Sequence, residues 1–430
     1  MSAIAKASAY AAVLVLCGLA GCRSTPAPPS VDALAHQYVA LVVELGARDF
    51  DSLDFNEDPD PSFAALQLNP EPLATLHQDA QALRDRIAHL PEDSTAAASR
   101  KVMLLAQTDA IVLRSEQLQG KNRSFDEESR IFFGVAAPPD NDAAARKAIR
   151  AQLAKLLGNS ADPAAAYAHF EAKFIVPPGR VPAVFNAAIA QCRAITVQHV
   201  ALPAGEHVDV EYVSHKPWSA FSRYLGRAHS LIQLNMDYPL TVDRILNLAC
   251  HEGYPGHHVF NSLRDQDVAQ GLHREEFRVQ PTFSPQSYVS EAAASYAPDM
   301  LLADDRLRVE RDVLVPLAGL KNLDVKREFQ IEDLVEALHT AEPSIARDYL
   351  DGNLEFVRAA DALERETLMQ HGEITLLYLN EFRTYMLAYT VGADAMQASI
   401  EAGQPTNAER WQRYVELMKN PVVSIPAPNP

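Results

Sequence analysis

Apolar residues recur every three to four positions along most of this chain, the spacing that gathers them on one face of a helix. In the first half, this pattern predicts helices over residues 31–48, 71–90, 94–119, 141–157, 163–174 and 181–197. In the second half, it predicts a helix that starts at Thr241 and helices over residues 331–339, 350–370, 373–402 and 407–418. Pro, Gly, Asp or Asn residues separate these segments, as is typical of loops.

Strand patterns are confined to one region. Strand candidates concentrate between about residues 202 and 235, where residues 208–213 alternate between apolar and polar side chains and residues 230–235 form a second short candidate. The sequence therefore predicts a mostly α fold with a small β-sheet. We expect a helical N-terminal lobe over residues 31–200 and a second, metal-binding lobe over residues 201–430, packed as one cooperative unit.

The helix that follows the strands leads into the most informative segment of the chain. Pro239 and Thr241 are typical of a helix entry and N-cap, and the apolar residues that follow are spaced for a buried face. On its last turns the chain reads H-E-G-Y-P-G-H-H, residues 251–258. Three histidines and a glutamate within eight residues indicate a divalent-metal site.

A proline changes how this segment must be interpreted. The common zinc-peptidase pattern H-E-x-x-H needs a histidine four residues after the first, but that position is Pro255. In an unbroken helix, His257 would lie about 9 Å along the axis from His251 and on another face. Pro255 cannot continue the helix, and Gly256 permits unusual backbone angles. We therefore expect a break that brings the next histidines back toward His251.

The octet and the segment over residues 208–296 resemble a family of bacterial lipoproteins and secreted proteins of undefined function. The signature of that family is H-E-x-x-P-G-H-H, and similarity places it in the gluzincin clan of zinc metallopeptidases. The resemblance implies a zincin-like helical metallopeptidase with a central cleft. A later E-G-W-A-L-Y-A-E block of the family is matched here at Glu291, Ala294, Tyr296 and Ala297. Its Trp and last Glu are absent, and Pro298 stands where that Glu would be.

The resemblance implies a downstream glutamate as the third metal ligand, so we expect His251, His257 and Glu291 to hold Zn²⁺. Two imidazoles and a carboxylate leave one position open for water, as in catalytic zinc sites. Glu291 is expected at the start of an apolar helix; the alternative is that it only caps or pairs with an arginine. Alignment on the Gly-His pair favours His257. His258 is the alternative ligand, or otherwise a catalytic-site residue that orients a carboxylate, contacts substrate or stabilises an oxyanion.

Two further side chains are expected to take part in catalysis. Glu252, beside a ligand histidine, is expected to be the general base. Gluzincins commonly use a tyrosine to stabilise the oxyanion, and the family's Q-A-L-x-Y-K-x-G block aligns its Tyr and Gly with Tyr389 and Gly392. Tyr385 and Thr390 stand where its Gln and Lys would be. The alternative for Tyr389 is packing in the core.

The N-terminus predicts where the protein is found. Lys6, an apolar run over residues 9–20 and the sequence Leu19-Ala20-Gly21-Cys22 are typical of a lipoprotein signal peptide over residues 1–21. Cys22 would carry the lipid, and residues 22–30 would form a Pro-rich tether. We expect the outer membrane, facing the periplasm; an ordinary secretion signal is the alternative. The apolar run is shorter than the roughly 20 residues of a membrane-spanning helix.

Cysteine usage and charge limit the remaining possibilities. Cys192 and Cys250 could pair, but Cys250 beside His251 on a buried helix is expected to pack as a small apolar residue. The formal net charge is −18, which argues against nucleic-acid binding and against electrostatic attachment to anionic membranes.

The sequence as a whole predicts a lipid-anchored, zinc-dependent hydrolase. A metallopeptidase that acts on a peptide or oligopeptide is the favoured interpretation, with attachment to the membrane only through the lipid. A metal-dependent amidase or esterase that acts on envelope material is one alternative. A non-catalytic lipoprotein that binds peptides in the same cleft is the other.

Overall fold

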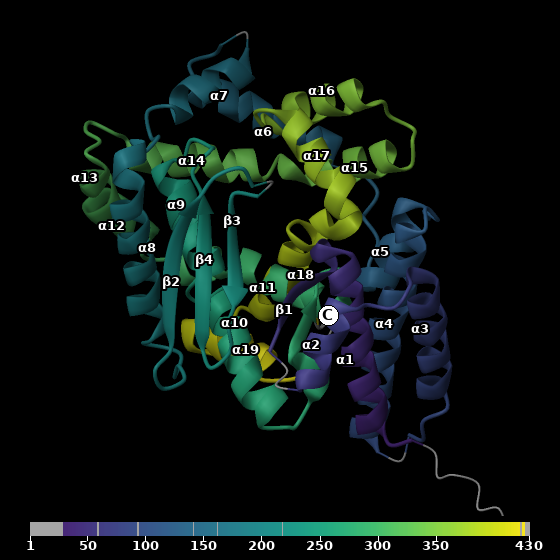
Figure 1. Cartoon of the computed structure of the whole chain (residues 1–430). Coiled ribbons are helices and arrows are strands. Elements are labelled where there is room, and N and C mark those ends of the chain that lie inside the picture. The colour runs from purple at the N-terminus through teal and green to yellow at the C-terminus, as the bar shows by residue number, and fades with distance from the viewer. Residues whose placement is uncertain are drawn as a thin grey trace, which may run out of the picture.

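The computed structural model describes residues 29–57, 60–92, 94–140, 142–160, 162–216, 218–421 and 424–425. The expected signal peptide over residues 1–21, the lipidated Cys22 and most of the tether lie outside this part of the chain. The described residues form a mostly helical structure with two small β-sheets, which confirms the predicted fold class at that level (Figure 1). None of the described helices is both long enough and apolar enough to cross a membrane.

Helices build the first half of the chain. They are α1 (Val31–Arg48), α2 (Pro61–Leu68), α3 (Leu73–Ala88), α4 (Thr95–Leu118), α5 (Phe125–Phe133), α6 (Ala143–Leu156), α7 (Pro163–Glu171) and α8 (Val181–Thr196). Ser30 caps α1 by accepting a hydrogen bond from the amide of Ala33, and Ser94 caps α4 in the same way. Helices α1, α3 and α4 bury their apolar faces in a shared core, and Figure 1 shows them as a bundle beside the rest of the molecule.

The larger sheet has three strands, β2 (His207–Val213), β3 (Ala220–Tyr224) and β4 (His229–Asn235), in the order β2-β4-β3. Strand β2 runs parallel to β4, and β3 runs antiparallel to it. The strands predicted over residues 208–213 and 230–235 are thus confirmed. Along β2 the side chains alternate, so that Val208, Val210 and Tyr212 pack on the main core while the residues between them are exposed. The second sheet pairs β1 (Leu53–Asn56) with β5 (Val279–Pro281).

The second half returns to helices. They are α9 (Val242–Glu252), α10 (His257–Arg264), α11 (Pro285–Leu302), α12 (Arg306–Val309), α13 (Val315–Ala318), α14 (Val325–Glu336), α15 (Glu342–Leu350), α16 (Phe356–Thr367), α17 (Gly372–Phe382), α18 (Val391–Glu401) and α19 (Asn407–Met418). The main core is formed by apolar residues of α8, α9, α10, α11 and α19, among others. The main core therefore joins helices that precede and follow the sheet.

One predicted helix is interrupted in the structure. The pattern over residues 373–402 predicts a continuous helix, but α17 ends at Phe382 and a 3-10 segment over Arg383–Ala388 separates it from α18. The backbone of Arg383 has φ 50° and ψ −119°, which no α-helix can accommodate. Periodicity alone does not reveal this break, because apolar residues continue through it.

The two cysteines of the described chain form a disulfide. Cys192 on α8 is bonded to Cys250 on α9, with their Cα atoms 5.6 Å apart. The expectation that Cys250 packs as a free apolar residue was wrong. Helices α8 and α9 lie against each other in the main core, so the two sulfurs lie at the contact between them. The periodicity of the sequence does not predict which two helices pack together. The bond ties α8 to α9, the helix whose last turn carries His251.

Candidate metal centre

Helix α9 carries His251 and Glu252, the first two residues of the octet over residues 251–258. Thr241 caps α9 by accepting a hydrogen bond from the amide of Arg244, which confirms the predicted start of this helix. Its apolar face is buried in the main core, including Ile245, Leu246 and Ala249. His251 and Glu252 occupy the last turn, and Gly253 caps the end of the helix.

The chain then turns back over the end of α9. The Tyr254–Pro255 peptide bond is cis, and the amide of Gly256 donates a hydrogen bond to the carbonyl of Cys250 over 3.0 Å. A Cβ atom on Gly256 would lie only 1.8 Å from the carbonyl oxygen of His251, so no other residue fits this turn. Helix α10 begins at His257 directly afterwards. The predicted break inside the motif is therefore present, as a turn between two helices.

The turn places two imidazoles next to each other and beside a carboxylate. The ring centroids of His251 and His257 are 4.8 Å apart. Glu291 reaches both from α11: its Oε1 lies 3.1 Å from Nε2 of His251, and its Oε2 lies 3.4 Å from Nε2 of His257. One ligand atom from each residue lies within 4.8 Å of the others. We refer to His251, His257 and Glu291 as the buried centre.

The residues of the buried centre suit a divalent metal ion. Neighbouring ligands of a tetrahedral zinc ion, each about 2 Å from the metal, lie about 3.3 Å apart, close to the two spacings in the structure. Burial alone would raise the pKa of Glu291. The two nearby histidines have the larger, opposite effect, so its pKa lies below the usual range. Burial lowers the pKa of His257, and Glu291 more than compensates, raising it to about 9. A buried carboxylate here demands positive charge, which protons or a metal can supply.

The position of Glu291 within its helix differs from the expected one. We expected Glu291 at the start of a helix, but α11 begins at Pro285, with Ser284 as its cap. Glu291 therefore lies about two turns inside the helix, where its side chain is 5% exposed. An apolar stretch after Glu291 indicates a helix but not how far that helix extends upstream.

Glu252 lines a large cavity next to the buried centre. The cavity has a volume of about 600 Å³, and its walls include His251, Glu252 and Tyr389. Burial raises the pKa of Glu252 above its usual value, although the neighbouring histidines oppose the shift. The structure thus brings Glu252, the expected general base, and His251, an expected metal ligand, to the wall of one cavity.

Two tyrosines lie beside the buried centre: Tyr385 in the 3-10 segment and Tyr389 directly after it. One is buried and the other is partly exposed. Tyr385 is buried and donates a hydrogen bond to Oε2 of Glu291 over 3.1 Å. Tyr389 is 41% exposed, lines the cavity and stacks near His251, with ring centroids 6.4 Å apart. Desolvation of the hydroxyl groups and the nearby carboxylate of Glu291 raise the pKa of both tyrosines well above the usual value, so both stay protonated at neutral pH. Of the two tyrosines, Tyr389 is therefore the one that lines the cavity.

His258 points to a different set of partners from His257. Its side chain is fully buried, with Nδ1 2.8 Å from Oγ of Ser230 and Nε2 3.1 Å from Oε2 of Glu206. Burial raises the pKa of Glu206, but hydrogen bonds from His258, Tyr254 and Arg193 lower it to about 2. Of the roles considered for His258, orienting a carboxylate matches these contacts. The structure brings His257, and not His258, to His251 and Glu291.

Three residues near the buried centre were not singled out from the sequence. Arg244 lines the cavity, and the carboxylates of Asp243, Glu252 and Glu336 act electrostatically on its guanidinium. Ser290 lies 3.4 Å from Nδ1 of His257. Asp54, on β1, is close enough to act electrostatically on His257, and burial raises its own pKa to about 7. Arg244 lies two helical turns before His251, so the sequence could have placed it on the same face of the helix. The sequence around Asp54 gives no indication that it lies near this site.

Comparisons with known proteins leave the function open. No protein-family model and no curated protein matches the chain. The fold is similar to a "putative lipoprotein" from Colwellia psychrerythraea, with 13% identity over 90% of this chain and 74% of that one, and a TM-score of 0.49. A "putative lipoprotein of unknown function" from Shewanella oneidensis is 11% identical over 84% of this chain and 75% of that one, with a TM-score of 0.45. These likenesses are too distant to support a function, and the family resemblance of the octet stays a prediction.

Proposed function

We propose that this protein is a lipid-anchored, zinc-dependent hydrolase of the bacterial envelope, and specifically a metallopeptidase. One observation carries the proposal: His251, His257 and Glu291 converge at ligand spacing beside Glu252, at the wall of a cavity of about 600 Å³. Three protein ligands leave a position for water or substrate, which separates catalytic from structural zinc sites. Attachment through Cys22 at the periplasmic face of the outer membrane is part of the same proposal.

The chain supplies the groups that peptide hydrolysis needs around such a metal. A zinc ion held by the buried centre would polarise a substrate carbonyl and acidify a water molecule. Glu252 would accept the proton from that water and hand it to the leaving amine, a role for which its raised pKa is suited. Tyr389, protonated and facing the cavity, would donate a hydrogen bond to the developing oxyanion.

The wall of the cavity favours an extended peptide as the substrate. Strand β3 is at the edge of its sheet and, within the described chain, pairs only with β4. Residues 218–220, at the start of β3, line the cavity together with His251. An edge strand can bind an extended peptide through backbone hydrogen bonds, which sets the peptide against the metal-bearing helix. Arg244 adds a positive charge to the same wall.

The deciding experiment compares two matched variants of the full chain. Bound metal is measured on purified wild type, Glu252→Gln and Glu373→Gln, and each is incubated with peptides, esters and cell-wall amides, with and without a chelator. Glu373 is an exposed glutamate on α17 and serves as the control. We expect chelator-sensitive peptide cleavage that Glu252→Gln lowers by about 10²–10⁴-fold without loss of metal, while Glu373→Gln behaves as wild type.

Other outcomes would support the alternatives. Cleavage of esters or cell-wall amides alone would favour an amidase or esterase with the same metal chemistry. Absence of turnover on every substrate, with peptide affinity unchanged in Glu252→Gln, would favour a binding protein. A purified protein that takes up no zinc at the buried centre would contradict all metal-dependent versions of the proposal.

A further inference from the structure

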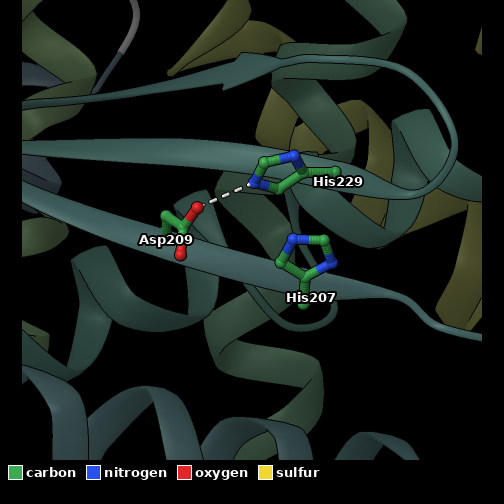
Figure 2. Close-up of side chains that lie close together, drawn as sticks. All are labelled: His207, Asp209 and His229. Carbon is green, nitrogen blue, oxygen red and sulfur yellow. Dashed lines mark hydrogen bonds and ion pairs between the residues drawn. The ribbon is translucent and has the colours of Figure 1, made fainter.

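A second group of metal-ligating side chains lies on the outer face of the three-stranded sheet. Strands β2 and β4 run parallel, and His207 and His229 are direct partners across the pair. Because side chains two residues apart on a strand share a face, Asp209 projects on the same side as His207. Figure 2 shows the three side chains gathered over these strands. We refer to His207, Asp209 and His229 as the outer trio.

The spacing within the outer trio matches that of metal ligands. One ligand atom from each residue lies within 4.8 Å of the others. Nε2 of His229 lies 3.0 Å from Oδ2 of Asp209, again close to the roughly 3.3 Å between ligands of a tetrahedral ion. The rings of His207 and His229 are stacked with centroids 3.9 Å apart. A cation between His229 and Asp209 would replace the proton that they now share.

The hydrogen bond of His207 prepares its ring for a cation. Nδ1 of His207 lies 3.2 Å from the backbone carbonyl oxygen of Gly205. A carbonyl only accepts, so Nδ1 must carry the hydrogen, and in the neutral ring Nε2 keeps its lone pair. Metal-binding histidines typically fix their tautomer and orientation by donating the other ring N–H to a carbonyl or carboxylate. This contact is therefore the arrangement expected around a ligand histidine.

The outer trio is accessible, and its chemistry selects the type of ion. The side chains of Asp209 and His229 are 66% and 27% exposed, so an ion can enter and keep water on its open positions. Imidazole nitrogens suit Zn²⁺, Cu²⁺ and Ni²⁺, whereas Mg²⁺ and Ca²⁺ prefer oxygen ligands throughout. We propose that His207, Asp209 and His229 form a second divalent-cation site, of the zinc type, on the outer face of the sheet.

Counting bound zinc tests this proposal separately from the proposed function. The metal-free full chain is titrated with Zn²⁺ alone, and the bound equivalents are measured after dialysis. We expect two equivalents for wild type, one for His207→Ala/His229→Ala and one for His251→Ala/His257→Ala. The control His89→Ala removes an exposed histidine directly after α3 and should keep both equivalents. Two equivalents in His207→Ala/His229→Ala would overturn the outer site and leave the hydrolase proposal untouched.

A second measurement needs no variant and so does not depend on how variants fold. The wild-type protein is treated with diethylpyrocarbonate, and modification of each histidine is followed by mass spectrometry. We expect saturating Zn²⁺ to slow the modification of His207 and His229 at least tenfold and that of His89 not at all. Mg²⁺ should protect none of the three. Unchanged modification of His207 and His229 in the presence of Zn²⁺ would overturn the second site.

Discussion

The buried centre and the outer trio have the same types of candidate metal ligands in opposite surroundings. Each consists of two histidines and one carboxylate, but the carboxylate is 5% exposed in Glu291 and 66% exposed in Asp209. Water can solvate the outer carboxylate, whereas the buried one depends on nearby positive charge. The buried centre has a general-base candidate, Glu252, and a cavity beside it. The types of side chain in a cluster therefore indicate that it could bind a metal ion. Its burial and the residues around it decide whether a bound metal could take part in catalysis.

The largest expected effect separates the two adjacent histidines of the octet. His257→Ala removes a ligand and should weaken zinc binding at the buried centre roughly a thousandfold, given the total strength of structural zinc sites. His258→Ala should keep the zinc but lower the free energy of unfolding by about 2–4 kcal/mol, because Glu206 loses a partner in a buried position. Zinc titration and denaturant unfolding measure the two effects. Retained zinc affinity in His257→Ala would contradict the ligand assignment.

The turn between α9 and α10 can be broken with one methyl group. Gly256→Ala would place a Cβ against the carbonyl of His251, so the turn must shift and carry His257 away from His251. We expect loss of the zinc equivalent at the buried centre and about 3–5 kcal/mol less stability, with the outer trio still occupied. Gly179→Ala is the matched control, since a Cβ there meets nothing within 4 Å. Equal behaviour of the two variants would refute the steric explanation.

The disulfide should matter to the buried centre and not to the outer trio. Cys250 precedes His251 on α9, and its bond to Cys192 spans 58 residues of chain. Removing the bond in Cys192→Ala/Cys250→Ala should lower the free energy of unfolding by about 2–4 kcal/mol, mainly through the unfolded state, and weaken zinc binding at the buried centre. Denaturant unfolding measures the loss. Each single variant should match the double variant, because either one removes the bond.

The pH dependence of zinc binding tests the electrostatics of the buried centre. Glu291 raises the pKa of His257 to about 9 in the metal-free protein, so a proton occupies this ligand below that pH. Zinc binds only the neutral imidazole, so its apparent affinity should rise about tenfold per pH unit up to about pH 9 and then level off. Competition with a chelator on the His207→Ala/His229→Ala background isolates this centre. A flat profile between about pH 7 and pH 9 would contradict the shift.

The smallest expected effect concerns how substrate is held. Arg244→Gln should raise KM about fivefold to tenfold and change kcat little, because a hydrogen bond from a charged donor in the cavity wall is lost while the buried centre is intact. Steady-state kinetics on the peptides cleaved by wild type measure this. An unchanged KM would place Arg244 outside the substrate path, and a large fall in kcat would assign it a role in catalysis.

Local chemistry made much of the chain predictable. The helices over residues 31–48 and 407–418 match the structure to the residue, because their apolar faces and their caps are encoded within a few turns. The break inside the octet was predictable for the same reason: proline excludes a helix and glycine permits the turn. His251 and Glu252 at the end of a buried helix follow from that pattern alone.

Tertiary packing decided the rest, because these features join residues that are distant in sequence. Whether His257 or His258 faces His251 depends on how α10 packs on β4, where Ser230 meets His258. The disulfide depends on which helices lie side by side. Asp54, on β1, acts electrostatically on His257 from a distant part of the sequence. The outer trio exists only because the register of β2 and β4 sets His207 opposite His229. Periodicity along the chain fixes which side of an element is buried, and it cannot specify which other element covers that side.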